Sequence, residues 1–232
     1  SFRFNKAIDE EVFRRALKLT QKGLGQPAFF NDDINISRVL ANGCNDIEEA
    51  RDYGILGCVE ASVCGKSDFR PVAGFINILK ILEVTMHDGV DPNGNYQFGP
   101  HTGKMEDMTS MEQFMEAYKK QLAFAIDYHL QAYGICSSLH SLIAPTVFAS
   151  TTVDDCIEKG RILQKDGAKY STTGTFISGV ANAADSLAAI DQVCFQQKLM
   201  TLAEMRDMLD SNYAGKEEWH LSLIHISEPT RH

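Results

Sequence analysis

The residues best suited to chemistry in this chain are Cys58 and Glu60, within the stretch GCVE at positions 57–60. Alternate residues of an extended strand face the same side, so we expect the Cys58 sulfur and the Glu60 carboxylate to project together into one cavity. A thiol can act as a one-electron or nucleophilic centre, and a carboxylate can carry a proton. Gly57 would allow a close backbone approach, and Ile55-Leu56 predicts a buried strand leading to it.

The same four residues also have a simpler interpretation. Cys58 would be a small buried hydrophobic residue, and Glu60 would be a surface residue two positions later. Matches to short motifs often arise by chance, so the surrounding sequence has to decide between the two interpretations.

Composition predicts an ordinary globular protein and argues against several kinds of partner. The chain has 232 residues, enough for one large core or two small ones, with 44% hydrophobic and 23% charged residues. Its formal net charge of −9, without a basic stripe, argues against nucleic-acid binding. No apolar run reaches the roughly 18 residues of a membrane span, and the first residues do not form a signal peptide. We therefore expect no membrane association and a cytoplasmic location.

The cysteines predict neither a metal centre nor a disulfide framework. No CxxC pair and no zinc-ligand spacing with histidine occurs among them. In a chain of this length we expect reduced thiols, no bound metal, and structural roles for Cys64 and Cys156. The six cysteines are Cys44, Cys58, Cys64, Cys136, Cys156 and Cys194.

The two ends of the chain need separate treatment. Residues 221–232, with the sequence LSLIHISEPTRH, match the in-frame translation of a transposase-type sequencing-library adapter, and we expect them not to be native. Ser1 is not an initiating methionine. We therefore expect residues 1–220 to be an internal fragment of a longer protein.

Hydrophobic periodicity predicts a helix-rich α/β chain. Before position 57 it predicts a helix over 9–22, a loop or short strand over 23–32, a helix capped by Asp32 or Asp33 through Leu40, and a helix from Asp46 through Asp52. Later elements are a buried helix over 73–87, a surface loop over 88–103, a helix with an apolar core stripe over 111–140, a strand over 167–176, and helices over 182–190 and 202–209. Asn77 and Glu83 would lie in apolar surroundings, where each needs a hydrogen-bond partner.

Four stretches form an ordered set of motifs over essentially residues 1–220. They are GLGQPAFFND at 23–32, ARDY at 50–53 with GCVE at 57–60, DDCIEKG at 154–160, and GAKY at 167–170 ahead of ANAADSL at 181–187. In this order the blocks resemble the glycyl radical enzymes of the pyruvate formate-lyase superfamily, in the single-cysteine eliminase and decarboxylase branch. The Cys-Val-Glu motif alone would be a weak match.

The resemblance implies a fold, a mechanism and two residue roles. The fold is a ten-stranded α/β barrel with the cysteine finger inside it, and this chain would be a helix-rich portion. In such enzymes a glycine radical on a C-terminal loop takes hydrogen from the finger cysteine, and the resulting thiyl radical takes hydrogen from the substrate. Carried over, Cys58 is the thiyl radical site and Glu60 is the general acid or base. The parent protein would be a radical lyase of anaerobic metabolism.

The resemblance also implies what works with the parent enzyme. Its substrate would be a small organic molecule, it would bind no cofactor, and a radical S-adenosylmethionine iron–sulfur activating enzyme would install its glycyl radical. The full-length protein would be a homodimer. No loop of the type Arg-Val-x-Gly-Tyr occurs in these 232 residues, so we expect the isolated chain to be inactive.

Three departures from the family patterns bear on the substrate. Acyl-transferring pyruvate formate-lyases carry two adjacent finger cysteines, whereas Gly57 precedes Cys58 here, which argues against thioester chemistry. Diol and choline lyases follow the finger with Gly-Lys and then Trp-His-Asp, whose Asp contacts a substrate hydroxyl. This chain keeps Gly65-Lys66 but has Arg70-Pro71-Val72, without that Asp. Their Thr-Gly-Pro-Gln is Thr173-Gly174-Thr175-Phe176 here, which replaces an amide by an aromatic ring.

These departures predict a pocket more apolar than a glycerol or propanediol site. Phe75 and Phe176 are the candidate walls, and Arg70 either holds a substrate carboxylate or sulfonate or faces solvent. A dehydratase, an arylacetate-type decarboxylase and another C–X or C–C lyase all remain open. Further candidates for substrate contact are Phe30, Phe148 and Thr175.

Two other functions remain open. Cys58 could be a polar nucleophile, which would need an activating base. The candidates His87, His101, His129 and His140 have no recognisable motif around them. Alternatively, the chain as it stands could be an inactive structural fragment.

Overall fold

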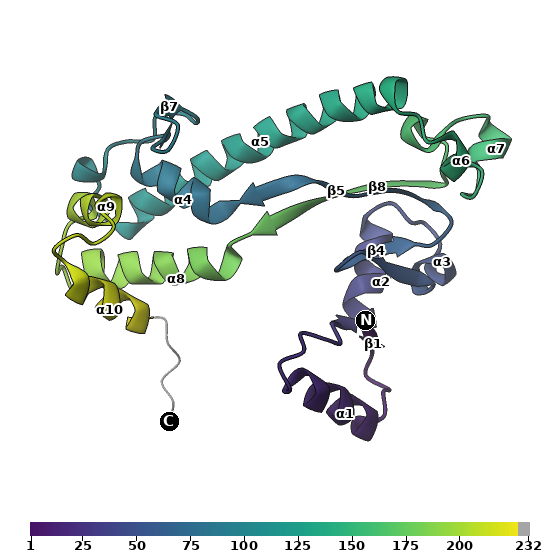
Figure 1. The fold of residues 1–232 in the computed structure, drawn as a ribbon, viewed down its shortest axis with the longest axis horizontal. Coiled ribbons are helices and arrows are strands. Elements are labelled where there is room, and N and C mark those ends of the chain that lie inside the picture. The colour runs from purple at the N-terminus through teal and green to yellow at the C-terminus, as the bar shows by residue number, and fades with distance from the viewer. Residues whose placement is uncertain (227–232) are drawn as a thin grey trace. The chain divides into compact units, whose positions relative to one another are not determined.

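A computed structural model describes residues 1–226, apart from the side chains of residues 69–72, 172 and 225. The chain divides into two compact units. The first unit comprises Ser1–Ala73 and Tyr133–Thr175, and the second comprises Gly74–Ala132 and Phe176–His232. Both units contain helices and strands (Figure 1).

The elements of each unit follow the chain order. The first unit contains β1 Phe2–Phe4, α1 Glu10–Thr20, β2 Phe29–Asn31, α2 Asp32–Ala41, α3 Ile47–Arg51, β3 Tyr53–Leu56, β4 Glu60–Val63, α6 Val147–Ser150, α7 Cys156–Lys159 and the 3₁₀ turn η2 Leu163–Lys165. The second contains α4 Ile78–Met86, β6 Val90–Asp91, β7 Tyr96–Gln97, η1 Met105–Asp107, α8 Val180–Ile190, η3 Asp191–Gln196, α9 Leu202–Asp210 and α10 Glu217–Ile226. Three elements continue from one unit into the other: β5 Ser67–Asn77, α5 Met111–Ile143 and β8 Tyr170–Ser178.

The first unit begins with two strands and a helix joined by aromatic packing. Asp9 accepts a backbone hydrogen bond and caps α1, which confirms the helix predicted there. Strands β1 and β2 pair in parallel. Their Phe2, Phe4 and Phe29 rings pack on Phe13 of α1, with centroid separations of 6.3, 5.2 and 5.7 Å.

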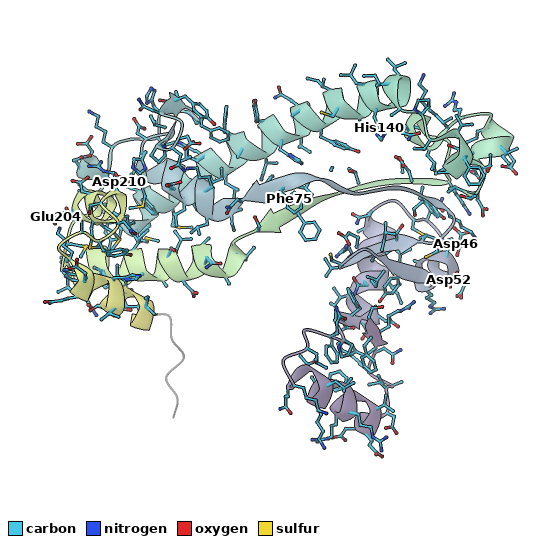
Figure 2. The ribbon with its side chains drawn as sticks, in the orientation of Figure 1. Asp46, Asp52, Phe75, His140, Glu204 and Asp210 are labelled. Atoms are coloured by element: carbon cyan, nitrogen blue, oxygen red, sulfur yellow. The ribbon has the colours of Figure 1, made fainter. Side chains whose placement is uncertain are left out.

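Of the N-terminal caps predicted for the next two helices, one is confirmed and one is wrong. Asp46 caps α3 as the sequence predicts, and Figure 2 shows Asp46 and Asp52 at the two ends of that helix. For α2 the predicted caps, Asp32 and Asp33, are wrong. Asn31 caps this helix by accepting a hydrogen bond from the Asp33 amide at 2.9 Å. Asp32 is already inside the helix, and its carboxylate binds other side chains.

The predicted helix over 73–87 is wrong in its first part. Residues up to Asn77 belong to β5, and only Ile78–Met86 form the helix α4. Phe75 is 69% exposed and Ile76 is 8% exposed, which is the alternation of a strand. A continuous apolar run does not distinguish a buried helix from a strand, and the sequence was ambiguous for that reason.

Asn77 marks the change from strand to helix. Its side-chain oxygen accepts hydrogen bonds from the amides of Leu79 and Lys80 at 3.1 and 3.3 Å, which caps α4. Glu83 forms an ion pair with Lys80 one turn earlier. Both residues have partners, but the apolar surroundings predicted for them are wrong, because Asn77 is exposed and the Glu83 side chain is 41% exposed.

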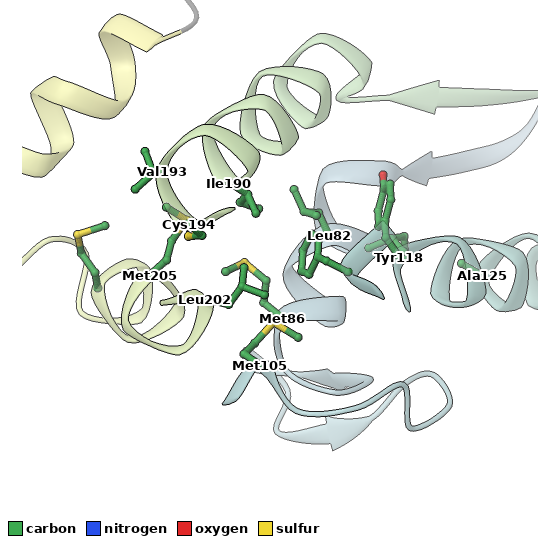
Figure 3. Packing of buried hydrophobic residues seen from close by; sticks show 13 residues of the cluster. Leu82, Met86, Met105, Tyr118, Ala125, Ile190, Val193, Cys194, Leu202 and Met205 are labelled. Carbon is green, nitrogen blue, oxygen red and sulfur yellow. Dashed lines mark hydrogen bonds between the residues drawn. The ribbon is translucent and has the colours of Figure 1, made fainter. Parts of the chain in front are cut away.

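The core of the second unit is built by α4, the first half of α5, α8, η3 and α9 (Figure 3). Helix α8 continues directly into η3, a single π-helical stretch. The members of this core that are at most 3% exposed are Leu82, Met105, Phe114, Ile190, Val193, Leu202, Met205 and Met208.

Helix α5 is present as predicted, but only its first half carries a core stripe. Phe114, Tyr118 and Ala125 are buried in the cluster of the second unit. Further along the same stripe, Ile126 is 38% exposed and Leu130 is 55% exposed. Within residues 1–226, no helix has the length and apolar character that crossing a membrane requires.

A matched pair of leucine substitutions tests this core. Leu82→Ala should lower the free energy of unfolding by about 2–5 kcal/mol, because it opens a cavity beside a side chain that is 3% exposed. Leu130→Ala removes the same atoms from a side chain that is 55% exposed and should cost less than about 0.5 kcal/mol. Urea denaturation followed by circular dichroism measures both. Equal losses would contradict the assignment of Leu82 to the core.

Candidate active site

Cys58 lies at the tip of the β3–β4 hairpin. The two strands pair antiparallel, with Tyr53 opposite Val63 and Leu56 opposite Glu60. Residues 57–59 form the turn between them, so the predicted extended conformation of 57–60 is wrong. The Cys58 thiol is exposed in this chain, unlike the buried hydrophobic residue of the simpler interpretation.

The turn also holds the Glu60 carboxylate. Its Oε2 accepts hydrogen bonds from the amides of Cys58 and Val59, both at 2.9 Å. Gly57 has a φ of +58°, and a Cβ there would lie 3.0 Å from the same oxygen, so glycine serves both the turn and the carboxylate. Backbone hydrogen bonds, and not strand alternation, therefore place an oriented carboxylate next to the backbone of Cys58.

Arg3 anchors the start of β3. Its Nε donates to Asp32 Oδ1 at 2.8 Å, and its Nη1 donates to the Tyr53 carbonyl at 2.7 Å. The guanidinium carbon lies 3.8 Å from the centroid of the Tyr53 ring. Tyr53 is 2% exposed and donates its hydroxyl to Asp32 at 2.7 Å. Burial and the bond to Asp32 raise the pKa of Tyr53 to about 12, so its hydroxyl remains a donor at neutral pH.

Glu49 anchors the far end of β4. Its Oε1 accepts hydrogen bonds from Lys66 at 2.8 Å and from Lys169 at 2.7 Å, and its Oε2 accepts one from the Tyr170 hydroxyl. Lys66 belongs to the turn after β4, and Tyr170 begins β8. The Glu49 side chain is 14% exposed. Hydrogen bonds from Lys169, Lys66 and Tyr170 lower its pKa to about 2.

The same turn after β4 also receives a bond from the segment at 154–160. The Asp154 amide donates to the Gly65 carbonyl at 2.8 Å. Lys159 of that segment donates to the Ala168 carbonyl at 2.9 Å, next to Lys169. All four motif blocks of the sequence therefore contribute contacts around the base of the β3–β4 hairpin.

Phe75 and Phe176 form one aromatic pair in the second unit. Their ring centroids lie 5.4 Å apart in a stacked arrangement, on strands β5 and β8 that pair with each other. Phe75 is 69% exposed and projects from this ribbon in Figure 2. The structure thus brings together the two residues that the sequence selects as pocket walls. Cys58 and Glu60 belong to the first unit.

The remaining residues proposed for substrate contact occupy separate elements of the first unit. Phe30 is 6% exposed within β2, as a core aromatic would be. Phe148 is 84% exposed on α6, and Thr175 is exposed on β8. The side chain of Arg70 lies outside the described residues, so its role stays a prediction.

Two of the candidate histidines pair with carboxylates of the second unit. His87 Nε2 lies 3.0 Å from the Asp210 carboxylate, and His101 Nδ1 lies 2.9 Å from that of Asp88, both within the second unit. Asp210 is labelled on α9 in Figure 2. In the part of the chain that the structure describes, no group of three or more His, Cys, Asp or Glu residues is placed to hold a metal ion.

Sequence reasoning missed the residues that anchor the hairpin. Arg3 and Asp32 are 29 positions apart, and Glu49 and Tyr170 are 121 positions apart. No periodicity or local spacing reports on contacts of that range. The one available signal was that Asp32, Tyr53 and Tyr170 fall inside the motif blocks.

The pH dependence of unfolding tests the Glu49 anchor. Folding lowers the pKa of Glu49 from 4.5 to about 2, so its contribution to stability is complete above pH 4.5 and is lost as the pH falls towards 2. Glu49→Gln removes this contribution. The difference in unfolding free energy between wild type and Glu49→Gln should therefore shrink as the pH falls from 4.5 towards 2. Urea titrations at several pH values measure it.

Glu48→Gln is the matched control for this prediction. Glu48 lies on the same helix, is 73% exposed and pairs with Arg51 one turn later. The difference in stability between wild type and this variant should change little with pH, because exposed pairs contribute little. A wild type–Glu49→Gln difference that does not depend on pH would contradict the assigned anchor.

Comparisons with known proteins agree along nearly the whole chain. Residues 1–228 match the profile described as pyruvate formate lyase-like. Trans-4-hydroxy-L-proline dehydratase of Clostridioides difficile is 36% identical over 92% of this chain, and (2S)-3-sulfopropanediol dehydratase of Klebsiella oxytoca is 30% identical over 97%. The chain spans 27% of the length of each of these relatives.

Solved structures agree with the sequence matches. The B12-independent glycerol dehydratase from Clostridium butyricum, with glycerol bound, superimposes with a TM-score of 0.82 at 37% identity and covers 93% of this chain and 27% of its own. A glycyl radical enzyme from Archaeoglobus fulgidus gives a TM-score of 0.80 at 29% identity, over 95% of this chain and 28% of its own. The predicted fold class, a helix-rich part of an α/β barrel, is confirmed. The chain belongs to the pyruvate formate lyase-like family of glycyl radical enzymes.

Proposed function

We propose that this chain carries the catalytic cysteine segment of a glycyl radical lyase, with Cys58 as the thiyl radical site and Glu60 as the proton carrier. The proposal rests on the geometry of the β3–β4 turn. It presents an exposed thiol at its tip and orients a carboxylate through the amides of Cys58 and Val59 at 2.9 Å. Hydrogen abstraction and proton transfer at neighbouring substrate atoms require these two groups side by side.

Each residue has one task in the proposed reaction. A glycyl radical elsewhere in the full-length enzyme, installed by a radical S-adenosylmethionine activating enzyme, supplies the unpaired electron. Cys58, as the thiyl radical, takes a hydrogen atom from a substrate C–H bond and becomes a thiol. Glu60 takes or gives a proton as the leaving group departs. Cys58 then returns its hydrogen atom to the product radical, which restores the thiyl radical for the next cycle.

Dehydration of a small hydroxylated substrate is the lyase reaction that the comparisons support best. Relatives at 36% and 30% identity are dehydratases by name. Decarboxylation is the second candidate, because indoleacetate decarboxylase of Tractidigestivibacter scatoligenes is 27% identical and the Phe75–Phe176 pair would suit an aromatic substrate. A cytoplasmic location and a homodimer of the full-length enzyme are part of the same proposal.

Substitutions in the activated full-length enzyme test the two roles. Cys58→Ser should abolish turnover, because a hydroxyl group does not take the place of a thiyl radical. Glu60→Gln should lower kcat by about 10²–10⁴-fold through loss of the proton carrier. Cys136→Ser, at an exposed cysteine on α5, is the control and should keep wild-type activity. An electron paramagnetic resonance signal of the glycyl radical in all variants shows that activation is intact, and turnover by Cys58→Ser would refute the proposal.

We also propose that residues 1–220 are the native segment and that 221–232 are not. Helix α10 crosses this boundary. Beyond it Leu221 and Ile224 are 61% and 45% exposed, whereas Leu223 and Ile226 pack against the core of the second unit. Long-read sequencing of the gene should show a different sequence after His220, continuing to a loop of the type Arg-Val-x-Gly-Tyr. A native reading frame that encodes residues 221–232 and then stops would contradict this boundary.

A further inference from the structure

A small cavity with both polar and apolar walls lies beside β4. Its volume is about 100 Å³, and its walls come from α2, β4, β5 and β8 within the first unit. Glu60 and Ser62 lie two positions apart in β4 and therefore face the same side of the hairpin. Asp68 of β5 and Tyr170 of β8 supply further polar wall atoms.

Ser62 contributes a hydroxyl group to this cavity that no described residue satisfies. The residue is 8% exposed, and its Oγ has no hydrogen-bond partner among the residues that the structure describes. Its neighbour Ser67, by contrast, accepts a hydrogen bond from the Val63 amide at 3.2 Å. Buried hydroxyl groups are almost always paired with protein atoms or with ordered water, because an unpaired one costs free energy.

The size and lining of the cavity suit ordered water. A water molecule takes up about 30 Å³ in the liquid, so a few molecules fit, and each needs two to four polar partners. The Ser62 hydroxyl, the Glu60 carboxylate and the carboxylate of Asp68, which is 3% exposed, provide such partners in one space. An apolar ligand would leave the buried Ser62 hydroxyl without a partner.

We propose that Ser62 binds ordered water in this cavity and that the water relays protons between Glu60 and Asp68. The relay rests on the proposed role of Glu60 as the proton carrier. After Glu60 has accepted a proton from the substrate, its carboxyl group gives a proton to the bound water, and the water gives one to the Asp68 carboxylate. Glu60 becomes a carboxylate again, Asp68 becomes a carboxylic acid, and the water is regenerated. Ser62 is a positioning residue, because it holds the water and does not itself change protonation state.

The water site is tested by the structure of the full-length enzyme. A high-resolution crystal structure should show a water oxygen about 2.6–3.2 Å from Ser62 Oγ. Ser62→Ala should lose or displace this water while the β3–β4 hairpin stays in place. A wild-type cavity that is empty, or that is filled by a side chain from another part of the enzyme, would overturn the inference.

The relay is tested by kinetics. Ser62→Ala should lower kcat by about tenfold with KM little changed, because the substrate does not contact Ser62 and only proton transfer is slowed. Added formate can accept and donate protons, so it should restore part of the rate that Ser62→Ala loses. Formate would not restore the rate if the substitution had damaged the structure. Ser37→Ala is the matched control, since the Ser37 hydroxyl lies on the exposed side of α2 and donates to the Asp33 carbonyl. This variant should keep wild-type kcat and show no response to formate.

The outcomes separate the relay from the function on which it rests. If Cys58→Ser is inactive but Ser62→Ala has wild-type kcat, the relay is wrong and the radical lyase stands. If Cys58→Ser turns over, the proposed function itself is wrong. Should Ser62→Ala fail to fold, Ser62→Thr keeps a hydroxyl group and should retain both the water and the rate. Loss of the water together with an unchanged rate in Ser62→Thr would overturn the relay.

Discussion

The anchoring of the β3–β4 hairpin at its base is the constraint on which the rest of the site depends. A hairpin tip with an exposed thiol makes few contacts of its own, so its direction has to be set where the strands begin and end. Arg3 and Asp32 fix the start of β3, and Glu49 fixes the chain after β4. The Asp32 and Glu49 side chains are 16% and 14% exposed, so several charge-assisted hydrogen bonds converge on partly desolvated carboxylates. Such networks are stronger and more directional than isolated surface ion pairs.

This anchoring gives a physical meaning to motifs that are scattered along the sequence. The blocks at 23–32, 50–60, 154–160 and 167–170 contain no common chemistry. In the structure they supply Asp32, Tyr53, the Asp154 amide and the Lys169-Tyr170 pair to the base of one hairpin. Under the proposed function, the groups that react come from the block at 57–60, and the other blocks set the position from which those groups act.

The number of residues between two interacting partners decides how much of the fold and of the candidate site could be predicted from the sequence. Helix α1 and the Asp46 cap of α3 were predictable, because caps and amphipathic periods involve residues only a few positions apart. The last part of β5, residues 73–77, was taken for helix because an apolar run has no clear period there. The turn at 57–59 was missed because its hydrogen bonds to Glu60 involve backbone amides, which residue type does not report. The pairs that anchor the hairpin could not be predicted, because many residues separate the two partners of each pair in the sequence.

The difference between local and long-range contacts also bears on how one hairpin can serve different reactions. Glu60 binds the backbone amide of Cys58, so the relation between the carboxylate and the Cys58 backbone is set by the turn. The anchors then aim this pair as one unit. Under the proposed function, the choice of substrate belongs to side chains outside this turn. Relatives named as dehydratases, decarboxylases and a sulfite-lyase match 84–98% of this chain, at 24–36% identity. Under the proposed function, a pair placed by local backbone geometry can remain the same while the pocket around it changes, because one fold can carry different sites.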